Sequence, residues 1–210
     1  MTAPVAPADL RSAMILAAVH RAFMDKGFDG ASMQDLAREA GMSVGNFYRY
    51  FPSKAAIVEA IITHDLQDLE RDFSEIIGSK NPMQRLRDTI KKHVEDGLCN
   101  GDGRLWAEIA AVALRKPEIA AIVGRMDVAL KHQLTTVFSI TSGLPLEDVV
   151  HRYGAHASLL KMMVMASAMQ GCNNAGSQQA QLTELVLRTI NQTLNEIPQK
   201  TQKGQIDADA

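Results

Sequence analysis

The sequence predicts an all-α fold of about nine helices, made of an N-terminal three-helix domain and a larger helical C-terminal domain. Apolar residues recur at the three- and four-residue spacing of a helix face almost from end to end. The alternating pattern of a half-buried strand is nearly absent. The composition, 46% apolar and 22% charged in 210 residues, is that of a globular protein with enough chain for a sizeable core.

Two helices are expected before residue 42. The first extends from about Asp9 to Lys26 and ends at Gly27, because glycine readily adopts the left-handed conformation that closes a helix. Ser32 begins the second helix as its N-cap, and Asp35, three residues later, completes a capping box. This second helix is short and ends before Gly41.

A third short helix follows, and it is rich in aromatic residues. Ser43 is placed to cap this helix, and Pro52 ends it. Residues 47–51 contain four of the ten aromatic side chains of the chain. Phe47 and Phe51 are four positions apart and therefore share one face, which we expect to point into the core. The opposite face carries Gly45, Asn46, Tyr48 and Arg49, with Tyr50 on the flank.

The two short helices and the glycine turn between them form a helix-turn-helix, a motif whose second helix enters the major groove of DNA. The hydroxyl, amide and guanidinium groups on the outer face of the third helix suit contacts with phosphates and base edges. The net charge of the chain is −2, and residues 1–54 hold six basic against five acidic side chains. DNA binding would therefore depend on positioned groups more than on a basic surface.

Residues 29–61, DGASMQDLAREAGMSVGNFYRYFPSKAAIVEAI, resemble the DNA-binding signature of the TetR family of bacterial transcriptional regulators. The match is dense and continuous, and it extends back through Gly27 and Phe28 into the first helix. The resemblance implies a DNA-binding set that comprises phosphate contacts by Ser32, Tyr48, Tyr50 and Lys54, base-edge contacts by Val44, Gly45, Asn46 and Arg49, and the cap Ser43.

The sequence departs from this family pattern at two places. Residues 1–8 contain no basic side chain, so they lack the arm that would read the minor groove. Val44 stands where a polar or basic residue is common, and it would offer only an apolar contact, for example to a thymine methyl group. The angle of Val44 on the helix also permits a position in the core.

Six longer helices are expected after Pro52. Proline and glycine signals place them at about 54–77, 82–98, 104–115, 118–140, 146–171 and 178–196. We predict a helix-turn-helix DNA-binding domain over 9–55, a ligand-binding and dimerisation domain over 56–197, and a polar, disordered tail over 198–210.

The eighth helix indicates a homodimer. Between Ala155 and Met169 the only strongly polar side chains are His156 and Lys161, so apolar residues surround the helix. Such a helix must be buried on two sides, either wholly within one chain or against a second copy. For the second case the predicted interface consists of Ala157, Leu160, Val164, Leu182, Leu185, Val186 and Ile190.

A small-molecule effector is implied by the resemblance, and the residues themselves support a pocket less strongly. Four of the eleven methionines lie within residues 162–169, and Trp106 is the only tryptophan. Flexible thioethers and a flat ring suit an adaptable apolar site, but they suit a core equally well. The candidate pocket residues are His93, Trp106, Met126, Leu130, Gln133 and Met163.

The resemblance implies a homodimer that senses a small molecule, and the apolar candidates suggest a lipophilic ligand. We therefore expect a homodimeric repressor that leaves a palindromic operator in double-stranded DNA when this ligand binds. Both recognition helices must match grooves a fixed distance apart, and each is tied through Pro52 to the fourth helix, so small displacements would change their spacing. A regulator of the same fold that is controlled by a protein partner, or that has no ligand, is the nearest alternative.

An enzyme is the remote alternative. The sequence contains no His-Glu-x-x-His, no Cys-x-x-Cys, no P-loop, no G-x-S-x-G and no dinucleotide fingerprint, so no catalytic residue or cofactor is expected. Cys99 and Cys172 share no metal-ligand spacing. No signal-peptide pattern and no apolar run of membrane-spanning length occurs, which predicts a cytoplasmic protein without a membrane role.

Overall fold

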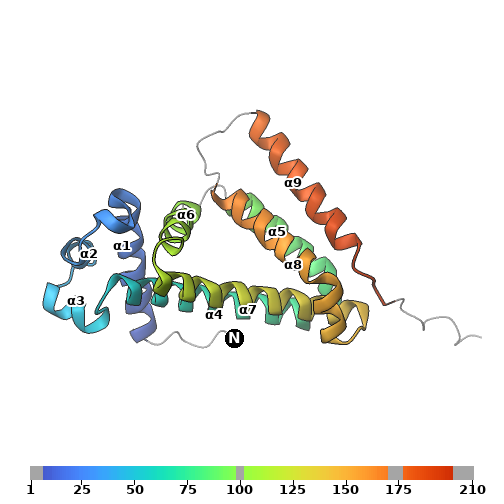
Figure 1. The fold of residues 1–210 in the computed structure, drawn as a ribbon, viewed down its shortest axis with the longest axis horizontal. Coiled ribbons are helices and arrows are strands. Elements are labelled where there is room, and N and C mark those ends of the chain that lie inside the picture. The colour runs from blue at the N-terminus through green and yellow to red at the C-terminus, as the bar shows by residue number, and fades with distance from the viewer. Residues whose placement is uncertain (1–6, 98–101, 170–176, 201–210) are drawn as a thin grey trace, which may run out of the picture. The chain divides into compact units, whose positions relative to one another are not determined.

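The computed structural model describes residues 7–97, 102–169 and 177–200, and every regular element in those ranges is an α-helix (Figure 1). The all-α prediction is confirmed. The helices are α1 (Pro7–Gly30), α2 (Met33–Glu39), α3 (Val44–Tyr50), α4 (Lys54–Gly78), α5 (Pro82–Gly97), α6 (Asp102–Ala113), α7 (Pro117–Ser142), α8 (Leu146–Met169) and α9 (Ser177–Asn195). Most of the predicted tail, residues 201–210, lies outside the described residues, as do Cys99 and Cys172.

The first helix is interrupted where the sequence places its end. Gly27 has φ 71° and ψ 166°, a left-handed conformation that breaks the helical path inside α1. The chain then makes one more turn, closed by a hydrogen bond of 3.1 Å from the backbone N–H of Ala31 to the carbonyl oxygen of Gly27. The turn contains Phe28 and Asp29.

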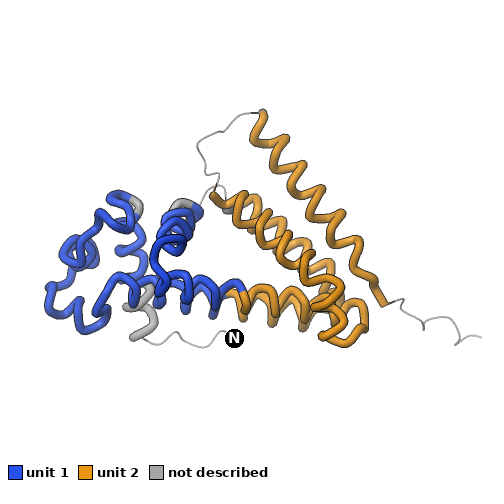
Figure 2. Tube along the Cα trace, viewed as in Figure 1, with its two compact units in different colours: residues 1–68, 101–127 blue, residues 69–100, 128–210 orange. Residues whose placement is uncertain are grey.

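The chain forms two compact units (Figure 2). Unit 1 comprises residues 1–68 and 101–127, and unit 2 comprises residues 69–100 and 128–210. Helices α4 and α7 each contribute residues to both units. The sequence predicts a boundary at residue 55 between a DNA-binding domain and a ligand-binding domain. That boundary separates two functions, not two compact units, and it stays a prediction.

The core of unit 1 is built around aromatic rings. Phe23, Phe28 and Phe47 are fully buried, and the rings of Phe23 and Phe28 stack with their centroids 5.3 Å apart. Phe47 and Phe51 lie 5.4 Å apart, and both are buried, which confirms that this face of α3 points inward. These rings pack in one core cluster with Leu36 of α2. Because a buried aromatic side chain contributes a large apolar area, this shared cluster holds the short helices α2 and α3 against α1.

The core of unit 2 includes side chains predicted to contact a second copy. Ala157, Leu160 and Ile190 are 0–2% exposed and pack into this core. They are already covered by their own chain, so assigning these three to a dimer surface was wrong. Val164, Leu182 and Val186 are partly buried, and Leu185 is 47% exposed.

The exposed face of α8 is also apolar. Its side chains are spaced by four and three residues in turn, so they form one stripe along the helix. This α8 stripe consists of Ala155, Leu159, Met162, Ala166 and Met169, all exposed. Met162 is 62% exposed, the largest exposed fraction among the leucines and methionines of the stripe.

Candidate nucleic-acid interface

Helix α2 begins with the predicted capping box. The backbone N–H of Asp35 donates to Oγ of Ser32 at 3.1 Å, and the backbone N–H of Ser32 donates to Oδ2 of Asp35 at 3.0 Å. Lys26 donates from Nζ to Oδ1 of the same carboxylate. The hydrogen bonds from Lys26 and then from Ser32 hold the pKa of Asp35 well below its ordinary value. The start of α2 is thereby tied to α1.

The turn between α2 and α3 depends on a glycine. Gly41 has φ 64°, a region that residues with a Cβ atom rarely enter. The next residue, Met42, donates its backbone N–H to the carbonyl oxygen of Ala37 at 2.9 Å and so closes the end of α2. Ser43 then caps α3 by accepting from the backbone N–H of Asn46 at 3.3 Å.

Helix α3 presents a polar face outward. Val44, Tyr48 and Tyr50 are 39%, 46% and 47% exposed, and Arg49 is exposed. Asn46 is partly exposed on the same face. Of the two positions that the sequence allowed for Val44, the structure has the outward one.

Gly45 lies in the first turn of α3, and its small size is not required by the fold. A Cβ atom added there would meet no other atom within 4 Å. Glycine in a helix costs roughly 0.5–1 kcal/mol relative to alanine. The packing of this chain therefore does not explain the glycine.

Two of the predicted phosphate-binding groups already have partners within unit 1. The hydroxyl group of Ser32 donates to Oδ2 of Asp35, and Nζ of Lys54 donates to the carbonyl oxygens of Phe28 at 2.7 Å and Asp29 at 3.0 Å. An ammonium group has three donors, so Lys54 keeps one for another acceptor. The phosphate contacts of both side chains stay predictions.

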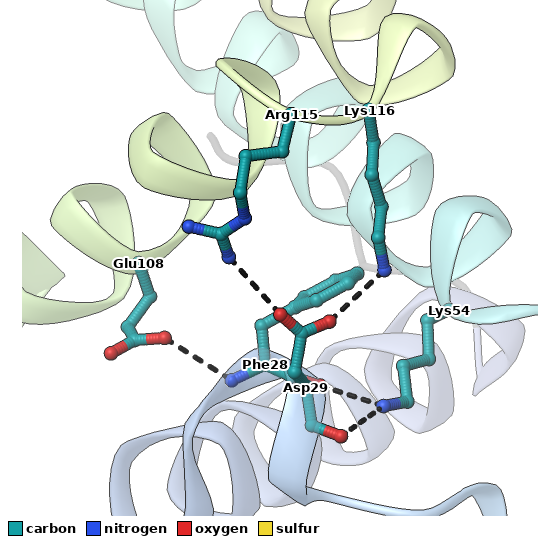
Figure 3. A network of polar contacts seen from close by, with 6 residues as sticks. All are labelled: Phe28, Asp29, Lys54, Glu108, Arg115 and Lys116. Atoms are coloured by element: carbon teal, nitrogen blue, oxygen red, sulfur yellow. Dashed lines mark hydrogen bonds and ion pairs between the residues drawn. The ribbon is translucent and has the colours of Figure 1, made fainter.

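A polar network around the last turn of α1 was not found from the sequence (Figure 3). Arg115 and Lys116, between α6 and α7, donate to the carboxylate of Asp29, and Glu108 on α6 accepts from the backbone N–H of Phe28. These partners are 80–87 positions apart in the sequence. No local pattern identifies such a pair.

The six candidate pocket residues do not share one core. Trp106 and Met126 pack against the core of unit 1, whereas Leu130 and Met163 pack against the core of unit 2. His93 is exposed and lies 3.5 Å from Asp72, and Gln133 is partly exposed. A ligand pocket formed by these six residues stays a prediction.

Unit 2 contains a groove of about 400 Å³ between α5 and α9, and none of the six candidates lines it. Its lining residues are Gln84, Arg87, Asp88, Lys91, Leu187, Ile190 and Asn191. Within the described ranges, His, Cys, Asp and Glu side chains form no group of three or more that could hold a metal ion. No helix in the same ranges has both the length and the apolar character needed to cross a membrane.

The family match lies over most of α1, over α2 and α3, and over the start of α4. Residues 15–61 match the family described as bacterial regulatory proteins, tetR family. The HTH-type transcriptional regulator UidR of Escherichia coli K12 is 30% identical over 124 residues. The matched segment covers 59% of this chain and 60% of UidR, so the chain spans less than two thirds of that relative.

Solved structures extend the likeness in fold to most of the chain. Salmonella enterica GusR has a TM-score of 0.70 and 21% identity, and the match covers 92% of this chain and 97% of GusR. AibR, solved in complex with isovaleryl coenzyme A and operator DNA, has a TM-score of 0.62 and 19% identity, with 86% and 97% covered. Both likenesses concern the fold, including the helical region beyond residue 61.

Proposed function

This chain belongs to the TetR family of bacterial regulatory proteins, and on that premise we propose that it is a homodimeric repressor of a palindromic DNA operator, released by a small molecule. One observation carries the DNA-binding part. On α3, Phe47 is fully buried, whereas Tyr48 and Arg49 are exposed. Gly45 is also exposed, and the packing of the chain does not require a glycine there.

We propose distinct roles for the exposed groups of α3. Asn46 and Arg49 carry the donors that read base edges, whereas the hydroxyl groups of Tyr48 and Tyr50 reach phosphates. Val44 offers an apolar contact, and Gly45 lets the backbone of α3 approach the groove. Ser32, Ser43 and Lys54 flank this face and supply further phosphate contacts.

Selection of bound duplexes from random DNA, followed by fluorescence anisotropy, tests the DNA-binding role. We expect an enriched palindrome whose half-site centres are one helical turn apart, about 34–36 Å. The selected duplex should bind at least 10³-fold more tightly than a scrambled duplex of the same length at physiological salt, the low end of typical specificity ratios. If no sequence is enriched and both duplexes bind alike, the proposed operator does not exist.

The homodimer uses the α8 stripe together with Leu185 of α9 in this proposal. An exposed apolar stripe along a long helix is costly in water, and a two-fold partner would cover it with its own copy. Sedimentation velocity at several protein concentrations tests the claim. A concentration-independent monomer would contradict it.

The effector in this proposal is a lipophilic small molecule, and acyl coenzyme A thioesters are the first class to test. AibR was solved with isovaleryl coenzyme A bound. We expect a compound of this class to raise the unfolding temperature and to lower operator affinity. Coupling is reciprocal, so DNA must weaken compound binding by the same factor, typically 5–150-fold. Equal affinity for free and DNA-bound protein would favour the alternative without a ligand, or with a protein partner.

A role in transcription requires access to the chromosome, so we propose that the protein acts in the bacterial cytoplasm. Its relatives are named as transcriptional regulators, which supports a regulator over an enzyme. We propose no catalytic step and no cofactor.

A further inference from the structure

Three polar contacts hold the last turn of α1 (Figure 3). They come from Glu108 of α6 and from Arg115 and Lys116 between α6 and α7, which together we call the α6–α7 corner. Nη2 of Arg115 lies 3.1 Å from Oδ2 of Asp29, and Nζ of Lys116 lies 3.0 Å from Oδ1. Oε2 of Glu108 accepts from the backbone N–H of Phe28 at 3.2 Å. The two oxygens of Asp29 thus bind two different cations, which fixes the orientation of its carboxylate.

The same turn holds Lys54, the first residue of α4, from the other side. Nζ of Lys54 donates to the carbonyl oxygens of Phe28 and Asp29 at 2.7 and 3.0 Å. The ring of Phe28 is buried, and the ammonium groups of Lys54 and Lys116 lie 5.4 and 5.1 Å from its centroid. Both distances are within the range of a cation–π contact. The residues at 28 and 29 therefore link the α6–α7 corner to Lys54.

The charges explain why an acidic residue is needed in this place. Lys54, Arg115 and Lys116 carry like charges around one turn of backbone. Asp29 supplies the negative charge that pairs with Arg115 and Lys116, and Glu108 contacts the backbone N–H of Phe28 on the same turn. The hydrogen bond from Lys116 holds the pKa of Asp29 below its ordinary value. Burial lowers the pKa of Lys54, and the charge of Asp29 opposes that effect.

We propose that Asp29 is a positioning residue for DNA binding, which acts by fixing the backbone carbonyls that orient Lys54 toward a DNA phosphate. This inference rests on the function proposed above. Arg115 and Lys116 hold the carboxylate, the carboxylate holds the turn, and the turn holds two of the three ammonium donors of Lys54. The third donor then has a defined direction. The α6–α7 corner thereby affects DNA binding without touching DNA.

Bulk electrostatics predicts that the loss of Asp29 strengthens DNA binding, whereas the positioning role predicts that it weakens operator binding. Replacing Asp29 by Asn removes one negative charge per protomer, and a more positive protein should bind any duplex more tightly. The positioning role predicts weaker binding to the operator in spite of the added charge. Asp25→Asn is the matched control, because Asp25 is an exposed carboxylate on the same helix and its loss changes the net charge equally.

The test measures operator affinity against salt concentration for the wild type, Asp29→Asn, Asp25→Asn, Lys54→Ala and the double variant Asp29→Asn/Lys54→Ala. Lys54→Ala should lower the slope of log K against log salt by about 0.9 per protomer, the value for one lost phosphate contact in duplex DNA. Asp29→Asn should lower the slope toward the same value and weaken operator binding about three- to tenfold, or about 0.7–1.4 kcal/mol. The double variant should be no weaker than Lys54→Ala.

Several results would overturn the positioning role. It is wrong if Asp29→Asn binds the operator like Asp25→Asn, if its salt slope equals that of the wild type, or if the double variant loses the product of both single effects. Thermal unfolding identifies a variant that fails to fold, and Arg115→Gln then tests the same contact from the other side with a smaller loss expected. A wild type that selects no operator rejects the proposed function itself, which is a different result.

Discussion

Helices α3 and α8 each bury one face in their own unit, but the faces that they leave exposed differ in chemistry. The exposed face of α3 carries hydroxyl, amide and guanidinium groups around a glycine, whereas that of α8 carries leucine, methionine and alanine. A polar face with fixed donors suits the phosphates and base edges of DNA. An apolar stripe suits another apolar surface. The two exposed faces therefore suit partners of different chemistry.

The buried faces of the two helices should behave alike, and they give the largest expected effect. Phe47→Ala should lower the free energy of unfolding by about 3–5 kcal/mol, and Leu160→Ala by about 2–5 kcal/mol, because each leaves a cavity in a packed core. Denaturant unfolding followed by circular dichroism measures both. If Leu160→Ala leaves the free energy of unfolding nearly unchanged, Leu160 is not buried in the core, and the two faces of α8 do not differ as described.

The exposed face of α8 should affect assembly and leave folding nearly unchanged. Met162→Glu places a charge in the proposed interface and should weaken the dimer at least 30-fold, about 2 kcal/mol, because the carboxylate loses water without gaining a partner. Sedimentation equilibrium measures this constant. Ser74→Glu adds the same charge at an exposed position of α4 and is the control. Equal dimer dissociation constants for the two variants would show that the α8 stripe is not the dimer interface.

The exposed face of α3 should affect sequence preference. Arg49→Ala should cost about 1–3 kcal/mol of operator affinity and reduce the difference between the operator and its variants at one base pair. Tyr48→Phe removes a phosphate contact and should weaken all duplexes about equally, by roughly 0.5–1.5 kcal/mol. Anisotropy titrations with a panel of single-base operator variants separate the two patterns. Uniform weakening by Arg49→Ala would mean that this side chain contacts only phosphate.

Gly45→Ala should raise the stability of the protein and lower its affinity for DNA. The added methyl group has open space in the free protein and favours the helix, so the free energy of unfolding should rise by roughly 0.5–1 kcal/mol. Operator affinity should fall, because the same methyl group occupies the space that the groove needs. Unfolding and titration of one protein sample measure both quantities. A variant that is more stable and binds the operator as tightly as the wild type would show that Gly45 does not face DNA.

The smallest expected effect concerns the cap of α2 and its dependence on pH. The pKa of Asp35 is lowered in the folded state, so its contribution to stability is present above the unfolded value near 3.8 and is lost as the pH falls through the folded value. The unfolding temperatures of the wild type and Asp35→Asn should therefore differ at pH 7 and converge below pH 3.8. A difference that stays constant down to pH 2 would mean that the charge of Asp35 is not involved.

The chemistry of α3 and α8 explains which parts of the molecule could be predicted. The sequence assigns the inner and outer faces of α3 correctly because Phe47 and Tyr48 differ in polarity. The helix caps could also be predicted, because each cap involves residues only a few positions apart. The two faces of α8 are both apolar, so the periodicity could not decide whether Leu160 or Leu159 faces the core of unit 2. The contact between Asp29 and Arg115 joins residues 86 positions apart, a separation at which no repeat or spacing gives information.

The bonds from Lys54 to the carbonyl groups of Phe28 and Asp29 also close a loop, since the residues they join are 26 and 25 positions apart. Closing a flexible loop of this length costs about 3 kcal/mol of chain entropy. The chain recovers that cost only when α2 and α3 both dock inside the loop, so the two helices should open and close as one cooperative unit. Their amide protons should then exchange with solvent at matching rates, and bound operator should slow both sets together. Hydrogen exchange at α2, a helix outside the proposed base-reading face, would thus report whether the operator is occupied.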